Sequence, residues 1–180
     1  MEVREAIERR SSIRSYSDEE VPGDVIEALA RASYLAPSAG DIHPYRIVVV
    51  RDEPKRRALA LASYEQEFIA EAPVSLVFFV DLDSAGRGYG ERGIRLYSLL
   101  DVGAAVENLM IVATDMGLGT CWVGAFDEQA VNELLGAPPE WRAVSIVSLG
   151  QPSGRDRHPP PPLLAEVLRS EDCRTGWWPS

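Results

Sequence analysis

Apolar residues recur every three or four positions in several separate parts of the chain, which is the pattern of amphipathic helices. The longest such part runs from Leu96 to Met116 and predicts a central helix, which the Gly-Leu-Gly run at 117–119 then ends. Shorter helices are predicted at residues 2–10, 25–36, 55–70 and 127–135. The Pro-Gly-Asp run at 22–24 and Asp127 are the expected starts of two of them.

Short runs of apolar and β-branched residues lie between these helices and predict buried strands. The runs are 45–50, 74–80 and 143–149, and residues 120–126 are expected to be extended. By contrast, residues 84–93 hold four glycines among charged side chains. We therefore expect a loop there, and the most mobile internal segment of the chain.

The last part of the chain differs in composition. Pro159–Pro162 are consecutive prolines, which stiffen the chain into an extended arm. No internal repeat or domain boundary is evident, so we expect one domain over residues 1–180, with about 155–180 as a proline-rich arm and tail. After the arm, Leu163 to Leu168 can pack again. Trp177 and Trp178 lie in a segment without hydrophobic periodicity, so the sequence assigns them no position in the fold. An arm that leaves the domain suggests contact with a neighbouring molecule.

Charge and composition exclude several classes of function. The chain has 18 Lys and Arg residues against 28 Asp and Glu residues, and its net charge of −10 repels nucleic acid and anionic membranes. The longest apolar run, 74–80, is too short to cross a bilayer, and the N-terminus lacks the apolar core of a signal peptide. We therefore expect a cytoplasmic protein without nucleic-acid or membrane partners.

Metal and nucleophile chemistry are poorly supported by the sequence. His43 and His158 are the only histidines, and neither has a second His or Cys at the spacing of metal ligands. The two cysteines, Cys121 and Cys173, form no disulfide framework, and Cys121 is expected to be a small buried hydrophobic residue. The sequence therefore predicts no metal site and no catalytic nucleophile.

Three other segments carry candidate chemistry. The motif Arg-x-Ser-x-Arg at 10–14 lies at a helix end, where two guanidinium groups and a hydroxyl could hold a phosphate; a solvated charge run is the alternative. Small residues at 37–44 could let the backbone approach a flat group, although a plain loop explains them nearly as well. Residues 117–124 offer exposed amides and one aromatic ring, and alone they indicate only a turn followed by a strand.

Taken together and in order, these segments resemble the flavin-dependent nitroreductase family, particularly its short members. Arg-x-Ser-x-Arg-x-Tyr at 10–16 resembles the family's phosphate motif, and Ala-Pro-Ser-Ala-Gly-x-x-x-Pro-Tyr at 36–45 resembles its flavin-ring loop. Residues 89–93 with 101–109 resemble its central helix, and residues 117–126 resemble its third flavin segment. The resemblance covers about residues 3–152, and its specificity comes from the order and spacing of the four motifs.

The resemblance implies an α+β fold with a central mixed or antiparallel sheet flanked by helices. It also implies an intertwined homodimer in which a terminal arm of each subunit embraces the other. Two FMN molecules would bind at the interface, with Pro37 and Ser38 approaching from the other subunit. The implied FMN-binding residues are Arg10, Ser11, Ser12, Arg14, Pro37, Ser38, Ala39, Asp41, Cys121, Trp122, Val123 and Gly124.

The implied mechanism is ping-pong. NADH or NADPH delivers hydride to the flavin N5 and leaves, and a nitroaromatic, a quinone or another small conjugated acceptor then takes two electrons from the same face. The flavin carries the chemistry, so no catalytic side chain is required. Two alternatives stay open: a different flavin reaction (ene reduction, dehalogenation, peptide-ring oxidation or flavin fragmentation), and a flavin-binding protein without turnover.

The sequence departs from the family pattern at three places. Asp41 stands where an asparagine usually hydrogen-bonds the flavin ring, and His43 stands where a glutamine is common. We expect His43 to be an exposed loop histidine; the alternative is a pH-dependent proton near the substrate. The late Arg or Lys that reaches the phosphate is replaced by proline, so Arg155 or Arg157 would have to substitute, and we assign Arg157 to this role.

The Asp41 departure gives a testable expectation. A carboxylate accepts hydrogen bonds but cannot donate them, so it should disfavour added electron density on a flavin ring that it faces. We expect Asp41→Asn to raise the flavin reduction potential, as measured by redox titration. Equal potentials in the two proteins would refute this role of Asp41.

Overall fold

Four antiparallel strands form the sheet at the centre of the computed structural model, which describes residues 1–154, 163–171 and 173–175. The strand order is β1-β2-β4-β3, with β2 and β4 in the middle. Their bounds are β1 Tyr45–Val50, β2 Val74–Asp81, β3 Gly119–Val123 and β4 Trp141–Gly150. The predicted strands are thus confirmed, and of the two sheet types expected, the strands form the antiparallel one.

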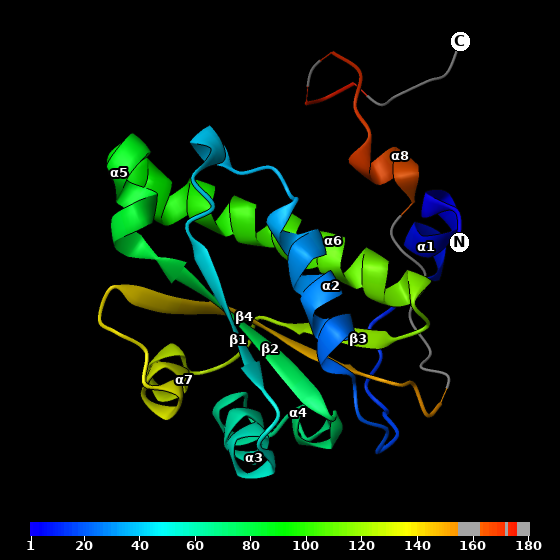
Figure 1. Ribbon diagram of the computed structural model, residues 1–180. Coiled ribbons are helices and arrows are strands. Elements are labelled where there is room, and N and C mark those ends of the chain that lie inside the picture. Colours follow the sequence, from blue (N-terminus) through cyan, green and yellow to red (C-terminus); the bar gives the residue numbers. More distant parts are fainter. Residues whose placement is uncertain (155–162, 172, 176–180) are drawn as a thin grey trace.

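Helices cover both faces of this sheet (Figure 1). On one face lie α2 (Gly23–Tyr34) and α6 (Ser98–Asp115); on the other lie α3 (Glu53–Ala62), α4 (Phe68–Glu71) and α7 (Glu128–Leu135). Successive β2 side chains alternate between the two layers: Phe78 packs with the α2 and α6 side, and Val77 and Phe79 pack with the other. Burial on both faces explains the unbroken apolar run of β2, and the predicted α+β fold is confirmed.

Most predicted helices form, with adjusted ends. The first is α1 (Val3–Arg9), and the central helix is α6, preceded by the π-helical turn η2 (Gly93–Tyr97). Asp127 caps α7 as predicted, because its carboxylate accepts the Ala130 N–H at 3.0 Å. The expected cap at residues 22–24 shifts: Pro22 is the N-cap residue of α2, and Gly23 is the first helical position.

The predicted loop at 84–93 is wrong, because this segment forms helix α5 (Leu82–Arg92). The Asp81 carboxylate caps the helix by accepting the Ser84 N–H at 2.9 Å. A Cβ at Gly93 would stand 2.1 Å from the Ala85 carbonyl oxygen, so this glycine permits η2 to fold tightly back on α5. Gly90, with φ of 52°, forms the kink. Gly93 thus serves close packing and Gly90 serves the change of direction.

Two further expectations need correction. The single helix at 55–70 is split into α3 and α4 by a turn in which Tyr64 and Glu65 have φ of 56° and 60°. This turn is tied to the segment after β3, since Gln66 Nε2 donates to Ala125 O at 3.1 Å. Strand β1 lies at the sheet edge rather than fully buried, and Val49 is 43% exposed.

The helical segment Leu82–Asp115 contains a window with a mean hydropathy of 1.5, so by length and composition alone it could cross a membrane. The expectation based on apolar run length overlooked this segment. Its inward side chains, including Val102, Val106 and Leu109, pack into the core beneath α2. A central helix of a water-soluble domain has this environment.

The expected C-terminal arm remains a prediction. Arg155, Arg157, the proline run, Trp177 and Trp178 all lie outside the described residues. After the prolines, the short helix α8 (Leu164–Val167) is described, and in the single protomer Leu163, Leu164 and Val167 are each at least 69% exposed.

The segment that follows α1 lies along strand β3. Ser12 forms an isolated parallel bridge with Thr120, and Ile13 N–H donates to Thr120 O at 2.8 Å. A Cβ at Gly119 would stand 2.8 Å from Ile13 Cβ, so this docking requires a residue without a side chain at 119. Tyr16 secures the far end through a hydrogen bond between its hydroxyl and Ser148 Oγ at 2.8 Å.

We predict that Gly119→Ala lowers the free energy of unfolding by about 1–3 kcal/mol, because the new methyl group overpacks against Ile13. Urea denaturation measures this change. Gly23→Ala is the matched control, since nothing lies within 4 Å of a Cβ at that position. The same loss of stability in both variants would contradict the docking argument.

Candidate functional site

Arg10 directly follows helix α1, and two contacts fix its position. As the C-cap residue, it donates its backbone N–H to Ala6 O at 2.9 Å. Its guanidinium Nε lies 3.2 Å from Glu107 Oε1 on α6. A guanidinium carries five N–H donors, so this ion pair orients the group while using only part of its fork.

Arg14 is held by an aromatic ring. Its guanidinium carbon lies 5.6 Å from the centre of the Phe68 ring on α4. Such a contact is electrostatic and uses no hydrogen bond, whereas a phosphate accepts hydrogen bonds from the guanidinium N–H groups. Ser11 and Ser12 are half-buried between the two arginines. The predicted phosphate motif is thus an ordered segment supported by α4, α6 and β3.

The predicted third flavin segment lies beside the first, because Ser12 pairs with Thr120 in β3. Cys121 and Val123 are 1% and 3% exposed, so their side chains belong to the core and only their main chain could face a ligand. The expected burial of Cys121 is confirmed. Trp122 is 40% exposed, and Gly124 has open space where a side chain would stand.

These residues fit the group that the resemblance implies. Two guanidinium groups and two seryl hydroxyls in one docked segment are the donors that a dianionic phosphate requires. The exposed Trp122 ring and the open backbone at Gly124 offer a surface for a flat ring system next to them. Arg157 lies outside the described residues, so the late cation stays a prediction.

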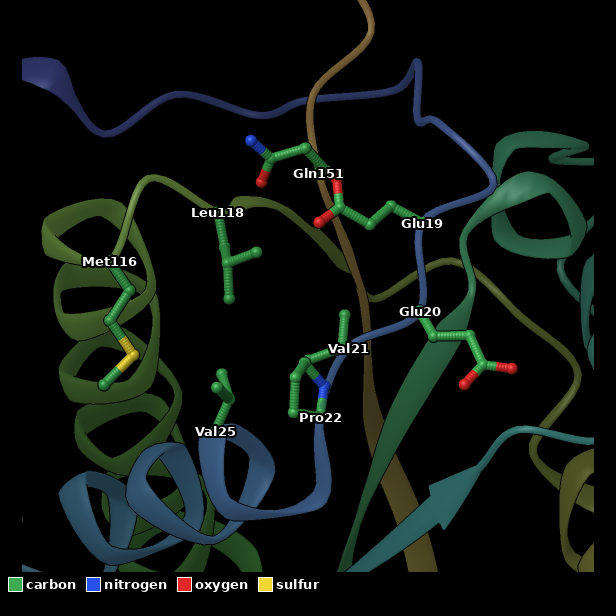
Figure 2. Close-up of a pocket in the computed structure, with 8 residues that line it drawn as sticks. All are labelled: Glu19, Glu20, Val21, Pro22, Val25, Met116, Leu118 and Gln151. Atoms are coloured by element: carbon green, nitrogen blue, oxygen red, sulfur yellow. The ribbon is translucent and has the colours of Figure 1, made fainter.

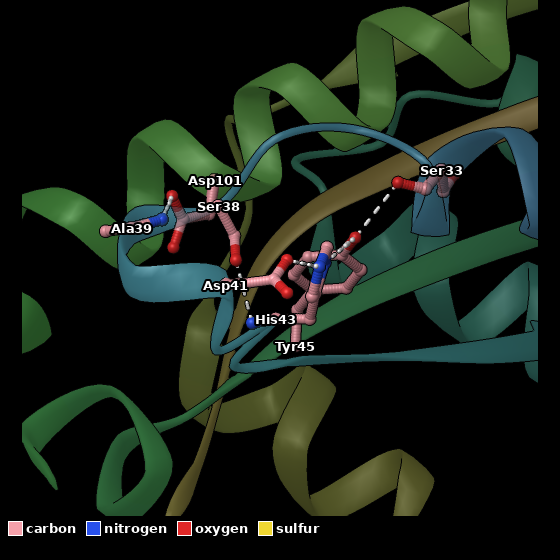
Figure 3. Close-up of polar contacts among 7 residues, drawn as sticks. All are labelled: Ser33, Ser38, Ala39, Asp41, His43, Tyr45 and Asp101. Atoms are coloured by element: carbon pink, nitrogen blue, oxygen red, sulfur yellow. Dashed lines mark hydrogen bonds and ion pairs between the residues drawn. The ribbon is translucent and has the colours of Figure 1, made fainter. Parts of the chain in front are cut away.

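The predicted flavin-ring loop contains the short helix η1 (Ala39–Asp41) and is fixed by α6. Ala39 N–H donates to Asp101 Oδ1 at 2.9 Å, as Figure 3 shows. Asp101 is 6% exposed, and its burial raises the pKa of the carboxyl against the opposing effects of the Ala39 hydrogen bond and His43. Pro37 is exposed, and Ser38 and Ala39 are half-buried.

Helix α6 separates this loop from the other two segments within one protomer. Gly103 and Glu107, spaced four residues apart, share one side of the helix and face Trp122 and Arg10 respectively. Asp101 points to a different side, and six residues separate it from Glu107, about 9 Å along the helix axis. The structure therefore brings the first and third predicted segments together and leaves the second apart.

His43 is not the exposed loop histidine that we expected. Its side chain is 17% exposed and its ring lies between Tyr34, with ring centres 4.9 Å apart, and Tyr45. Its Nε2 lies 3.0 Å from Asp41 Oδ1, while the Asp41 side chain itself is 94% exposed (Figure 3). The tertiary contact with Tyr34, at the end of α2, buries the histidine.

Tyr45 is the third aromatic residue of the cluster with Tyr34 and His43. Its hydroxyl donates to the Ser33 carbonyl at 2.9 Å. Burial, and then the negative charge of Asp101, raise the pKa of Tyr45 to about 12. The phenol therefore stays protonated at neutral pH and keeps its hydrogen bond to Ser33.

Two pockets of about 280 and 270 Å³ lie away from the predicted flavin residues. The first is lined mostly by apolar side chains at the start of α2 and the end of α6, with two glutamates at its edge (Figure 2). Neither lining includes a predicted site residue. Within the described residues, no group of three or more His, Cys, Asp or Glu side chains could hold a metal ion.

Sequence reasoning assigned no role to Asp101 or Phe68. The position of Asp101 next to Val102 and close to Leu99 and Leu100 in the central helix was the available signal, because buried acids need a hydrogen-bond donor. The stacking of Phe68 with Arg14 had no such signal, since it arises from the split between α3 and α4.

The sequence is similar to those of known proteins along most of its length. The sequence model of the Nitroreductase family matches residues 7–66 and 58–151. An NADH dehydrogenase of Thermus thermophilus is 29% identical over 180 residues, covering 85% of this chain and 88% of that protein. A 5,6-dimethylbenzimidazole synthase of Rhodospirillum rubrum is 29% identical, covering 86% of this chain and 82% of that protein.

A solved structure extends the agreement to the fold. The crystal structure of a nitroreductase family protein from Clostridium novyi superposes with a TM-score of 0.78 at 26% identity. The match covers 98% of this chain and 97% of that one.

Proposed function

This chain belongs to the nitroreductase family and is an NAD(P)H-dependent oxidoreductase, and we propose that it uses FMN to reduce small conjugated acceptors such as nitroaromatics and quinones. The FMN proposal rests on one observation: residues 10–14 form an ordered segment that is docked on β3. This segment carries Arg10 and Arg14, and Ser12 within it pairs with Thr120 of β3, two residues before the exposed Trp122.

The residues divide the work of binding. Arg10, Ser11, Ser12 and Arg14 would neutralise and hydrogen-bond the phosphate, and the β3 main chain would hold the ring. FMN supplies two-electron redox chemistry when bound. The chain's own task is to hold the ring, exclude water from one side of it and leave the other side open to nicotinamide and acceptor in turn. This task needs no acid, base or nucleophile from the chain.

We further propose that the working unit is a homodimer. The loop with Pro37, Ser38, Ala39 and Asp41 lies on a different side of α6 from the phosphate segment, so a second copy can supply it to the same flavin. Apolar side chains also lie exposed along α6 and at α1 and α2, which a partner would cover. They are Val3, Ile7, Tyr34, Leu35, Leu96, Leu99 and Leu100, each between 37% and 71% exposed.

Flavin fragmentation is the second candidate. The relative from Rhodospirillum rubrum is named 5,6-dimethylbenzimidazole synthase. The flavin ring system contains a dimethyl-substituted benzene ring, as does 5,6-dimethylbenzimidazole, so such a product can derive from the flavin itself. We propose the cytoplasm as the location of either activity.

The visible absorption spectrum of the purified protein tests the proposal. We expect a flavin spectrum that bleaches on anaerobic addition of NADH or NADPH and returns when a quinone is added. Bound flavin that neither nucleotide bleaches would favour a binding protein without turnover. Fragmentation would instead appear as irreversible loss of the flavin spectrum in the presence of oxygen.

We predict that Arg10→Met weakens FMN binding by the apoprotein about 10- to 100-fold, because a charge-assisted hydrogen bond contributes about 1.5–3 kcal/mol. Fluorescence titration of FMN measures this affinity. Arg9→Met is the matched control: it removes the same charge one position away, from a side chain that is 64% exposed and paired with Glu5. Equal losses in the two variants would mean that Arg10 acts only through net charge.

A further inference from the structure

The pocket between the start of α2 and the end of α6 has an apolar wall that continues the hydrophobic core. Its volume is about 280 Å³, near the lower end of the range for pockets that bind small molecules. Val21 is 2% exposed and belongs to the core, and Val25 and Leu118 pack against that core. Pro22 and Met116 complete the apolar lining. A ligand with an apolar body would therefore remove this surface from water.

Main-chain contacts hold the walls of the pocket in place. Arg51 Nη2 donates to the Val21 carbonyl at 2.7 Å, and Ser17 N–H donates to Gln151 O at 2.9 Å. Met116 is the adaptable part of the wall, because it is 44% exposed and its unbranched side chain can follow the shape of a ligand. The pocket thus combines fixed walls with one side chain that can close on a bound molecule.

A carboxylate stands at one end of this apolar lining. Figure 2 shows the Glu19 side chain extending toward Gln151, with both at the same end of the pocket. The neighbouring Glu20 carboxylate points away from Glu19 in this view, and Glu20 also lines the second pocket, together with Arg51. Among the residues that the structure describes, no Lys, Arg or His lines the first pocket, and Glu19 forms no ion pair.

A cation with an apolar body complements this lining. An ammonium group has three N–H donors, and both the Glu19 carboxylate and the side-chain carbonyl of Gln151 are acceptors. An anionic ligand would meet the Glu19 carboxylate without a cation to offset the repulsion. A neutral apolar ligand would pack on the walls but gain nothing from Glu19. The charge of the pocket therefore selects among ligands of the same shape.

We propose that this pocket binds a small organic ammonium ion. Its apolar body packs on Val21, Val25 and Leu118, and its charge pairs with Glu19. None of the residues that line the pocket is among those proposed to hold FMN, so this site does not rest on the proposed function.

Binding of 2-phenylethylamine to the protein, followed by NMR of the Val, Leu and Met methyl groups, tests this inference. We expect saturable shifts of the methyl signals of Val25, Met116 and Leu118, which line the pocket. The amine should bind about two- to fivefold more tightly than 2-phenylethanol, which is the range that an exposed ion pair contributes. The anionic 3-phenylpropionate should bind more weakly than either.

Glu19→Gln is the decisive variant, because it removes the charge from an exposed side chain and leaves the apolar walls unchanged. It should reduce the affinity for 2-phenylethylamine to that for 2-phenylethanol. Glu20→Gln is the matched control: it makes the same change one position away, at a carboxylate that points elsewhere, and it should keep the preference for the amine.

Three results would overturn the proposal. Equal losses in the two variants would mean that the net charge of −10 attracts the amine without a specific site. Equal affinities of the natural protein for the amine and the alcohol would remove the role of Glu19. A titration without saturable shifts at Val25, Met116 and Leu118 would show that the pocket does not bind the probe.

Discussion

The structure depends on how helix α6 is fixed. Val102, Val106 and Leu109 are buried between the sheet and α2, and full burial of each such side chain contributes about 1.5–3 kcal/mol. The remaining sides of the same helix contact the elements of the candidate site: Asp101 accepts from Ala39, Gly103 leaves space for Trp122, and Glu107 pairs with Arg10. A displacement of α6 would therefore disturb the core and every predicted flavin segment together. This coupling explains why one apolar helix also carries Asp101, Gly103 and Glu107 at fixed spacing.

Helix α6 contacts all three segments, and it keeps the loop near Asp101 apart from the other two. The loop is tied to the buried Asp101 and the phosphate segment to Glu107, and these two residues lie on different sides of α6. In our proposal a second protomer resolves this separation by supplying the missing loop. The exposed leucines of η2 and α6 are consistent with this arrangement, since a cluster of apolar groups on a monomer surface is stabilised by being covered. Flavin binding and dimer formation would then stabilise each other.

The sequence was informative where local pattern and tertiary environment agree. Strand β2 was predicted to within one residue because both of its faces are buried, which leaves an unbroken apolar run. The order of the motifs predicted the family, which the family match confirms. The errors lie where tertiary contacts override local preference. The glycines of α5 resemble a loop in sequence, yet Gly93 serves the close approach of η2 to Ala85. His43 looked exposed because its burial depends on Tyr34, which belongs to another element.

The charges of the candidate site follow one physical rule. A protein of net charge −10 must hold cations close together where it binds an anion, and those cations repel one another before the anion arrives. Glu107 beside Arg10 and the Phe68 ring beneath Arg14 lower that repulsion in two ways that leave the fork geometry intact. The chain thus places the groups that contact these two arginines on the neighbouring helices α6 and α4.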